Sequence, residues 1–96
     1  MSYRVWMIIN PPSRSEYRAV RDPDEGARLI NRVAQAHLRN PNIWCNVFGL
    51  QTDATGSWEE WDDENGDGVN KLADAIWEAE ARIKVEQLGQ ITGGGL

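Results

Sequence analysis

The segment D-P-D-E at residues 22–25 constrains the fold more than any other, because it is typical of the first turn of a helix. Asp22 is suited to cap the helix and Pro23 to its first position, where no amide donor is needed, while the glutamate completes a capping box. Apolar residues then recur at helical spacing until an Asn-Pro pair at 40–41. The sequence therefore predicts a helix over residues 23–39.

Four strands are predicted around this helix from runs of β-branched and aromatic residues bounded by turn residues. They span residues 3–9, 16–21, 43–51 and 57–62. The third is apolar on both faces and is expected at the centre of the sheet, whereas the acidic fourth is expected at an edge. A short Pro-rich loop separates the first two strands, which favours a hairpin.

A second helix is predicted from residue 69 to about residue 88, where Gly89 is suited to end it. Residues 91–96 are expected to form a flexible tail. Residues 1–90 then form a single domain of the α+β class. Its elements follow the order β-β-α-β-β-α, with a mainly antiparallel sheet and both helices on one face.

Composition limits the kind of protein further. The 96 residues suffice for one domain, and the apolar runs are shorter than the roughly 18 residues of a membrane span. The N-terminal segment lacks the pattern of a secretory signal, and the single Cys45 excludes an internal disulfide, so we expect a cytoplasmic location and no membrane partner. Cys45 falls in the third predicted strand and is expected to be buried and unreactive.

Charge is distributed unevenly along the chain. Residues 1–42 carry seven arginines and four acidic residues, a net charge of +3, whereas residues 43–96 carry three basic and eleven acidic residues, a net charge of −8. The sum is −5, and the pI of about 4.7 argues against direct nucleic-acid binding.

The predicted first hairpin and its exit carry residues that could bind a small anion. Guanidinium groups hold phosphate through paired hydrogen bonds, and aromatic rings stack on bases. The candidates, which combine both residue types, are Arg4, Trp6, Arg14, Tyr17, Arg18 and Arg21. The alternative is that these arginines pair with the acidic half of the chain, within one protomer or between protomers.

Three tryptophans are candidates for a protein interface. Trp58 and Trp61 are three residues apart in the predicted fourth strand, so they should point to opposite faces and leave one of them exposed. Trp77 lies outside the apolar stripe of the second helix and is available to another protomer. We therefore expect a homo-oligomer.

Residues 63–68 match the front of a calcium loop, which needs oxygen ligands at alternate positions and a glycine at the sharp turn. The candidate ligands are Asp63, Asn65, Asp67 and Asp74. The pattern departs from such loops at Asn70, where an apolar residue is usual, and at the last ligand, where the longer glutamate is usual. A tight turn before the second helix is the competing interpretation, and it leads us to expect no metal.

No residue set typical of an enzyme is present. The only histidine, His37, lies on the apolar side of the predicted first helix, where we expect it to pack. One histidine and one distant cysteine cannot form a zinc site, and no acidic residue is placed for a catalytic triad. We expect neither enzymatic activity nor a cofactor.

The segment at residues 58–66 follows the pattern W-x-E-W-x-D/E-x-x-G, which resembles small accessory proteins encoded by phages and prophages. Residues 3–12 and 20–26 look similar to the same proteins. The resemblance implies a viral accessory protein, of a kind that often acts on host defence. It carries over no catalytic residue.

These features favour a non-enzymatic binding protein that forms homo-oligomers and sequesters a small anionic, nucleotide-like signal. Two alternatives stay open. One is an acidic protein that inhibits a host factor, in the manner of a nucleic-acid mimic. The other is an interaction module stabilised by calcium.

Overall fold

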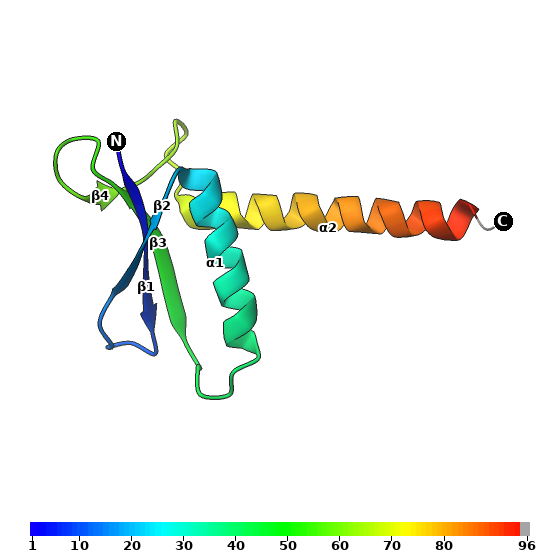
Figure 1. Ribbon diagram of the computed structural model, residues 1–96, viewed down its shortest axis with the longest axis horizontal. Coiled ribbons are helices and arrows are strands. Elements are labelled where there is room, and N and C mark those ends of the chain that lie inside the picture. The colour runs from blue at the N-terminus through cyan, green and yellow to red at the C-terminus, as the bar shows by residue number, and fades with distance from the viewer. Residues whose placement is uncertain (95–96) are drawn as a thin grey trace.

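The computed structural model describes the backbone of residues 1–94 and the side chains of residues 1–88. It confirms an α+β fold with the predicted order of elements (Figure 1). These are β1 (Tyr3–Ile9), β2 (Glu16–Val20), α1 (Pro23–Leu38), β3 (Asn46–Thr52), β4 (Glu59–Glu60) and α2 (Val69–Gly94).

The four strands form one antiparallel sheet in the order β2-β1-β3-β4. The hairpin of β1 and β2 is confirmed, and β1 also pairs along its whole length with β3. Because side chains alternate along a strand, Val5 and Met7 point to one face of the sheet and Arg4 and Trp6 to the other. The pairing of Val5 with Leu50 places two fully buried side chains side by side on the first face.

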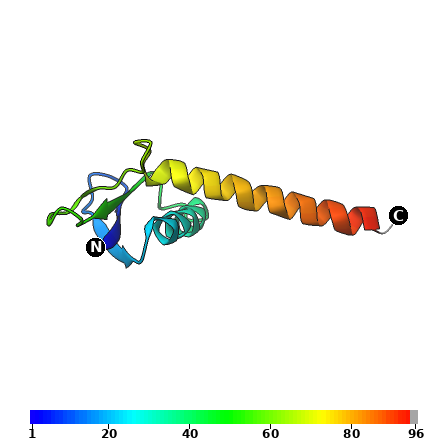
Figure 2. The same cartoon turned by 90° about the horizontal axis from the view of Figure 1, so that it is seen from above.

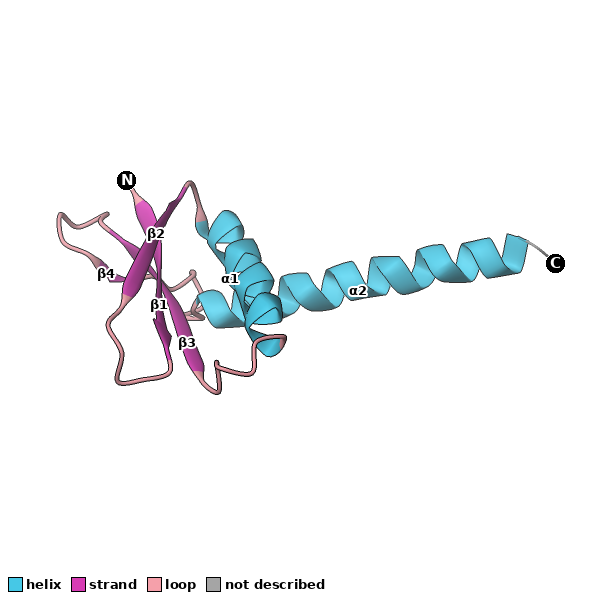
Figure 3. Cartoon of the chain, turned by 60° about the horizontal axis from the view of Figure 1, so that its bottom comes forward, coloured by secondary structure: helices cyan, strands magenta, loops and turns pink. Residues whose placement is uncertain are grey.

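Both helices lie against that first face, as predicted (Figure 3). The core between them and the sheet consists of Val5, Met7, Ala27, Ile30, Phe48, Leu50, Val69 and Ala73. Helix α1 begins as predicted, because the Asp22 carboxylate accepts a hydrogen bond of 2.8 Å from the Glu25 amide and Pro23 holds the first position. Near its end, the His37 ring stacks on Phe48 with 6.0 Å between ring centroids, so the histidine packs as expected.

Strand β3 begins at Asn46 and not at residue 43, because a long-range contact holds the preceding residues in a loop. The side-chain oxygen of Asn10 accepts hydrogen bonds from the amides of Trp44 and Cys45, at 3.0 and 3.2 Å. Cys45 is consequently exposed, and the expectation that it is buried in a strand was wrong.

Strand β4 is also shorter than predicted, with two residues in place of residues 57–62. Trp61 still donates its amide to the Leu50 carbonyl, and Asp62 forms an isolated bridge with Gly68. The chain then turns at once into α2.

Helix α2 is longer than predicted and projects from the rest of the molecule (Figures 1 and 2). Its first two turns pack through Val69 and Ala73, while every side chain from Trp77 to Leu88 is exposed. Gly89 does not end the helix, since one interior glycine costs only about 1 kcal/mol relative to alanine. Of the tail predicted at residues 91–96, the first four residues are helical and residues 95–96 lie outside the described residues.

The projecting helix gives the chain an elongated shape. Its radius of gyration is 16.5 Å, against about 12.5 Å for a compact chain of this length. Within the described residues, no helix combines the length and apolar character needed to cross a membrane.

Candidate functional site on the open face of the sheet

The face of the sheet opposite the helices, here called the open face, gathers an arginine and three aromatic side chains. Arg4 and Trp6 come from β1, and the strand register places Tyr17 of β2 opposite Trp6. Trp58 reaches the same face from the segment before β4. The two outer aromatic residues remain accessible, with Tyr17 exposed by 51% and Trp58 by 40%.

The Arg4 guanidinium lies between two aromatic rings. Its central carbon is 4.0 Å from the centroid of Tyr17 and 4.2 Å from that of Trp58. Its Nε donates a hydrogen bond of 2.8 Å to the side-chain oxygen of Gln51 on β3. In the described part of the chain its two terminal nitrogens have no hydrogen-bond or ion-pair partner. The planar group is thus held in place with one edge free to donate.

Trp6 lies flat across the neighbouring strand. Its indole nitrogen donates a hydrogen bond to the Glu60 carboxylate on β4. Its ring lies directly over Gly49, its partner on β3, where the Cβ of any other residue would overlap the indole. The absence of a side chain at Gly49 therefore makes the position of the Trp6 ring possible.

The structure brings together only some of the residues predicted for an anion site. Arg4, Trp6 and Tyr17 lie on the open face, as the alternation along two paired strands allows. Arg18 pairs in register with Val5 and so belongs to the opposite side of the sheet, on an exposed edge. Arg14 lies exposed in the loop between β1 and β2.

Arg21 is engaged elsewhere, at the start of α1. Its Nε lies 2.5 Å from the Glu25 carboxylate. The hydrogen bond and charge of Glu25, together with the charge of Asp22, raise the pKa of Arg21 above its ordinary value. Arg21 therefore does not join Arg4.

Trp58, which was predicted as an interface residue, forms one wall of the Arg4 site. The sequence holds no local signal for this contact, because it depends on β3 lying between β1 and β4. Trp61 packs against the core on the helix side, so the two tryptophans lie on opposite faces as their spacing predicts.

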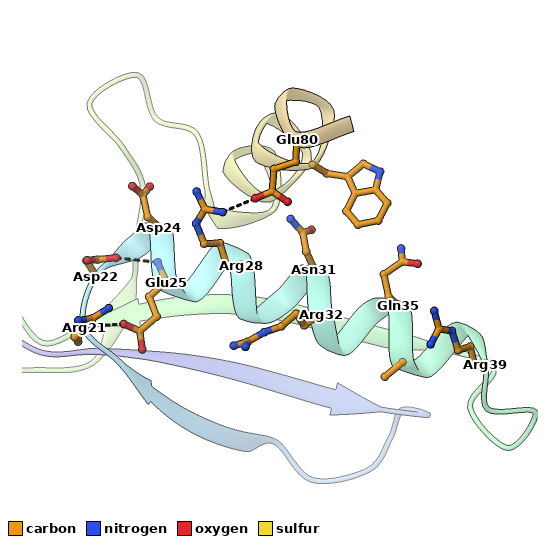
Figure 4. A pocket seen from close by; sticks show the side chains of 12 residues that line it. Arg21, Asp22, Asp24, Glu25, Arg28, Asn31, Arg32, Gln35, Arg39 and Glu80 are labelled. Atoms are coloured by element: carbon orange, nitrogen blue, oxygen red, sulfur yellow. Dashed lines mark hydrogen bonds and ion pairs between the residues drawn. The ribbon is translucent and has the colours of Figure 1, made fainter. Parts of the chain in front are cut away.

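A second concave region, here called the groove, lies between α1 and α2 and has a volume of about 670 Å³ (Figure 4). One side is a row along α1 and its C-cap, made of Arg28, Arg32, Gln35 and Arg39. The other side is formed by Trp77 and Glu80 of α2. Arg28 pairs with Glu80, so one arginine of the first half does meet the acidic half of its own chain. Arg32 and Arg39 make no ion pair with the described residues.

The calcium-like segment forms a tight turn. One oxygen of the Asp63 carboxylate accepts hydrogen bonds from the amides of Asn65 and Asp67, at 2.8 and 2.9 Å. Gly66 adopts a φ of 80°, and Asp67 lies 3.0 Å from Lys71. Asp74 is exposed on α2. Among the described residues, no group of three or more His, Cys, Asp and Glu side chains is placed to hold a metal ion.

Comparisons with known proteins give no match, so a proposal for the function rests on the geometry of the site. No family model, curated protein or solved structure matches the chain.

Proposed function

We propose that this protein is a non-enzymatic binding protein that holds a small anionic, nucleotide-like ligand on the open face of its sheet. The observation that carries the proposal is the Arg4 guanidinium, fixed between Tyr17 and Trp58 and oriented by Gln51. A free arginine side chain loses rotamer freedom when it binds, and one that is already held loses much less.

The free edge of Arg4 determines the chemistry of the ligand. The N–H groups of a guanidinium point outward in its plane, so further hydrogen bonds of Arg4 must lie in that plane. Two parallel N–H groups in a plane match the two oxygens of a phosphate or a carboxylate. An anionic group is therefore the partner for this edge.

The aromatic residues suit the flat part of such a ligand. Trp6 is two residues from Arg4 on the same face of β1, and Tyr17 lies directly across from Trp6. Stacking of a base on an aromatic side chain contributes about 1–3 kcal/mol and tolerates any base. A nucleotide could place its base over these rings while its phosphate meets Arg4.

A protein partner is the second candidate. The open face combines tryptophan, tyrosine and arginine, which dominate binding energy at protein interfaces. Glu60 lies beside this cluster, and the exposed Glu59 precedes it on the edge strand β4, so the acidic edge would favour a basic partner. A role as a phage accessory protein acting on host defence is compatible with either candidate and rests on the sequence resemblance alone.

Calorimetry with a panel of cyclic and linear nucleotides tests the proposal. Arg4→Lys keeps the charge but removes the planar pair of donors, so we expect it to weaken binding by about tenfold or more. Arg18→Lys is the matched control, because Arg18 lies on the same hairpin but on the opposite side of the sheet. Melting temperatures of both variants should match that of the wild type.

Absence of binding to every nucleotide at about 1 mM ligand would overturn the nucleotide proposal. Equal weakening by both variants would show that net charge, and not the Arg4 site, accounts for affinity. The second candidate would be favoured if exchange of Glu59 and Glu60 for glutamine abolished binding to a basic protein and Arg4→Lys left nucleotide binding unchanged.

A further inference from the structure

Among the described residues, the projecting part of α2 has little support from the rest of its own chain beyond the surface ion pair of Glu80 with Arg28. A helix of 26 residues extends for about 39 Å, and only its first turns contact the core. Isolated helices are marginally stable in water even when their sequences are favourable, so tertiary packing normally supplies their stability. This segment nevertheless carries apolar side chains that face solvent.

Three of these residues form one face, here called the distal face. Trp77, Ala81 and Val85 follow each other at intervals of four residues and therefore lie in one row along the helix. Trp77 is 47% exposed and Val85 is 68% exposed. Glu78 and Arg82 border the row on one side and line a shallow hollow with it. Glu80 and Lys84 border it on the other side.

The side chains of the distal face are complementary in size and charge to those of a second, antiparallel copy of the same face. If a second α2 runs antiparallel and crosses at Ala81, Trp77 meets the partner's Val85 and each Ala81 meets its copy. The same two-fold axis places Glu78 beside the partner's Arg82, and Glu80 beside the partner's Lys84. Every flanking charge thereby meets an opposite charge, with Glu80 also paired with Arg28 of its own chain, and the small alanine at the centre allows a close approach.

We propose that two copies of this chain associate through the distal faces of their α2 helices, antiparallel and with Ala81 at the two-fold axis. Such an interface stops at two copies and does not extend into a filament, because each copy contributes the same surface. Trp77 also lines the groove, so a helix packed on Trp77 lies at the edge of the groove. The inference does not depend on the function proposed for the open face.

Sedimentation velocity at about 100 µM protein tests the association. The wild type should sediment with twice the mass of the chain. Ala81→Glu places two carboxylates against each other at the axis and should give a monomer with an unchanged melting profile of the core. Glu86→Arg is the control, because residue 86 lies on the opposite side of the helix from the distal face. A monomeric wild type, or an Ala81→Glu dimer, would overturn the proposal.

Two charge variants test the pairing itself. Glu78→Arg and Arg82→Glu each create like charges across the interface, so each should raise the dimer dissociation constant about tenfold. Mixed in equal amounts they regain opposite charges, and dimers should return. A mixture that stays monomeric would contradict the pairing of these residues.

Cross-linking tests the antiparallel direction. With Cys45→Ala as background, chains carrying Glu78→Cys should form disulfides with chains carrying Arg82→Cys in preference to themselves. Preferential linkage of each variant to itself would indicate a parallel pair and would refute the arrangement.

Discussion

Asn10 joins two loops that are far apart in the sequence. Its backbone has a φ of 54°, a left-handed conformation that asparagine tolerates better than most residues. Its side chain accepts hydrogen bonds from Trp44 and Cys45 and donates one of 2.8 Å to the Asn42 carbonyl. One residue thus fixes where β1 ends and where β3 begins.

We predict that Asn10→Ala lowers the free energy of unfolding by about 2–4 kcal/mol, because it removes three hydrogen bonds and strains the backbone. Urea denaturation measures this loss. The exposed Asn42 is the comparison, since replacing its side chain by alanine should cost less than about 0.5 kcal/mol. Equal effects of the two substitutions would show that Asn10 does not hold the loops together.

Gly49 controls the position of Trp6. A methyl group at this position overlaps the indole, so Gly49→Ala must displace the ring and break its hydrogen bond to Glu60. The expected cost is about 1–3 kcal/mol of stability, together with a shift in tryptophan fluorescence. Gly68→Ala is the control, since the nearest atom to its new Cβ would be 3.7 Å away, an ordinary contact. An unchanged fluorescence spectrum in Gly49→Ala would contradict the described ring position.

At the scale of elements, the features that could be predicted are those set by neighbouring residues. The start of α1 follows from the Asp22 cap and Pro23, which act within one turn. The start of β3 could not be predicted, because it depends on Asn10, more than thirty residues away. The same distinction holds for the site. Alternation along β1 predicts that Arg4 and Trp6 share a face, whereas the contact of Arg4 with Trp58 could be predicted only from the order of the strands in the sheet.

The turn between β4 and α2 provides a prediction at the same scale. Asp63 uses one carboxylate oxygen for two backbone amides, so Asp63→Ala should lower the free energy of unfolding by about 1–2 kcal/mol. Millimolar calcium should leave the melting temperature of the wild type unchanged, because the Asp63 carboxylate already accepts the two hydrogen bonds of the turn. A rise of several degrees with calcium, reversed by a chelator, would contradict the turn interpretation and indicate bound metal.

For the whole molecule, the two proposed surfaces lie on separate parts of the chain. The open face is on one side of the sheet, while α2 leaves from the opposite side (Figures 1 and 3). Pairing through α2 therefore leaves the open face uncovered in both copies. The ligand stoichiometry should be one per chain, whether the chain is paired or is made monomeric by Ala81→Glu.

The central claim, that Arg4 on the open face recognises an anionic ligand, is tested most directly by nuclear magnetic resonance. Titration of the nitrogen-15-labelled protein with the tightest-binding nucleotide follows the arginine Nε–H and tryptophan indole N–H signals one by one. We predict that the signals of Arg4 and Trp6 shift and saturate together, while those of Arg32 and Trp77 in the groove stay constant. Shifts confined to Arg32 and Trp77, with Arg4 unchanged, would contradict the account and place the binding site between the helices.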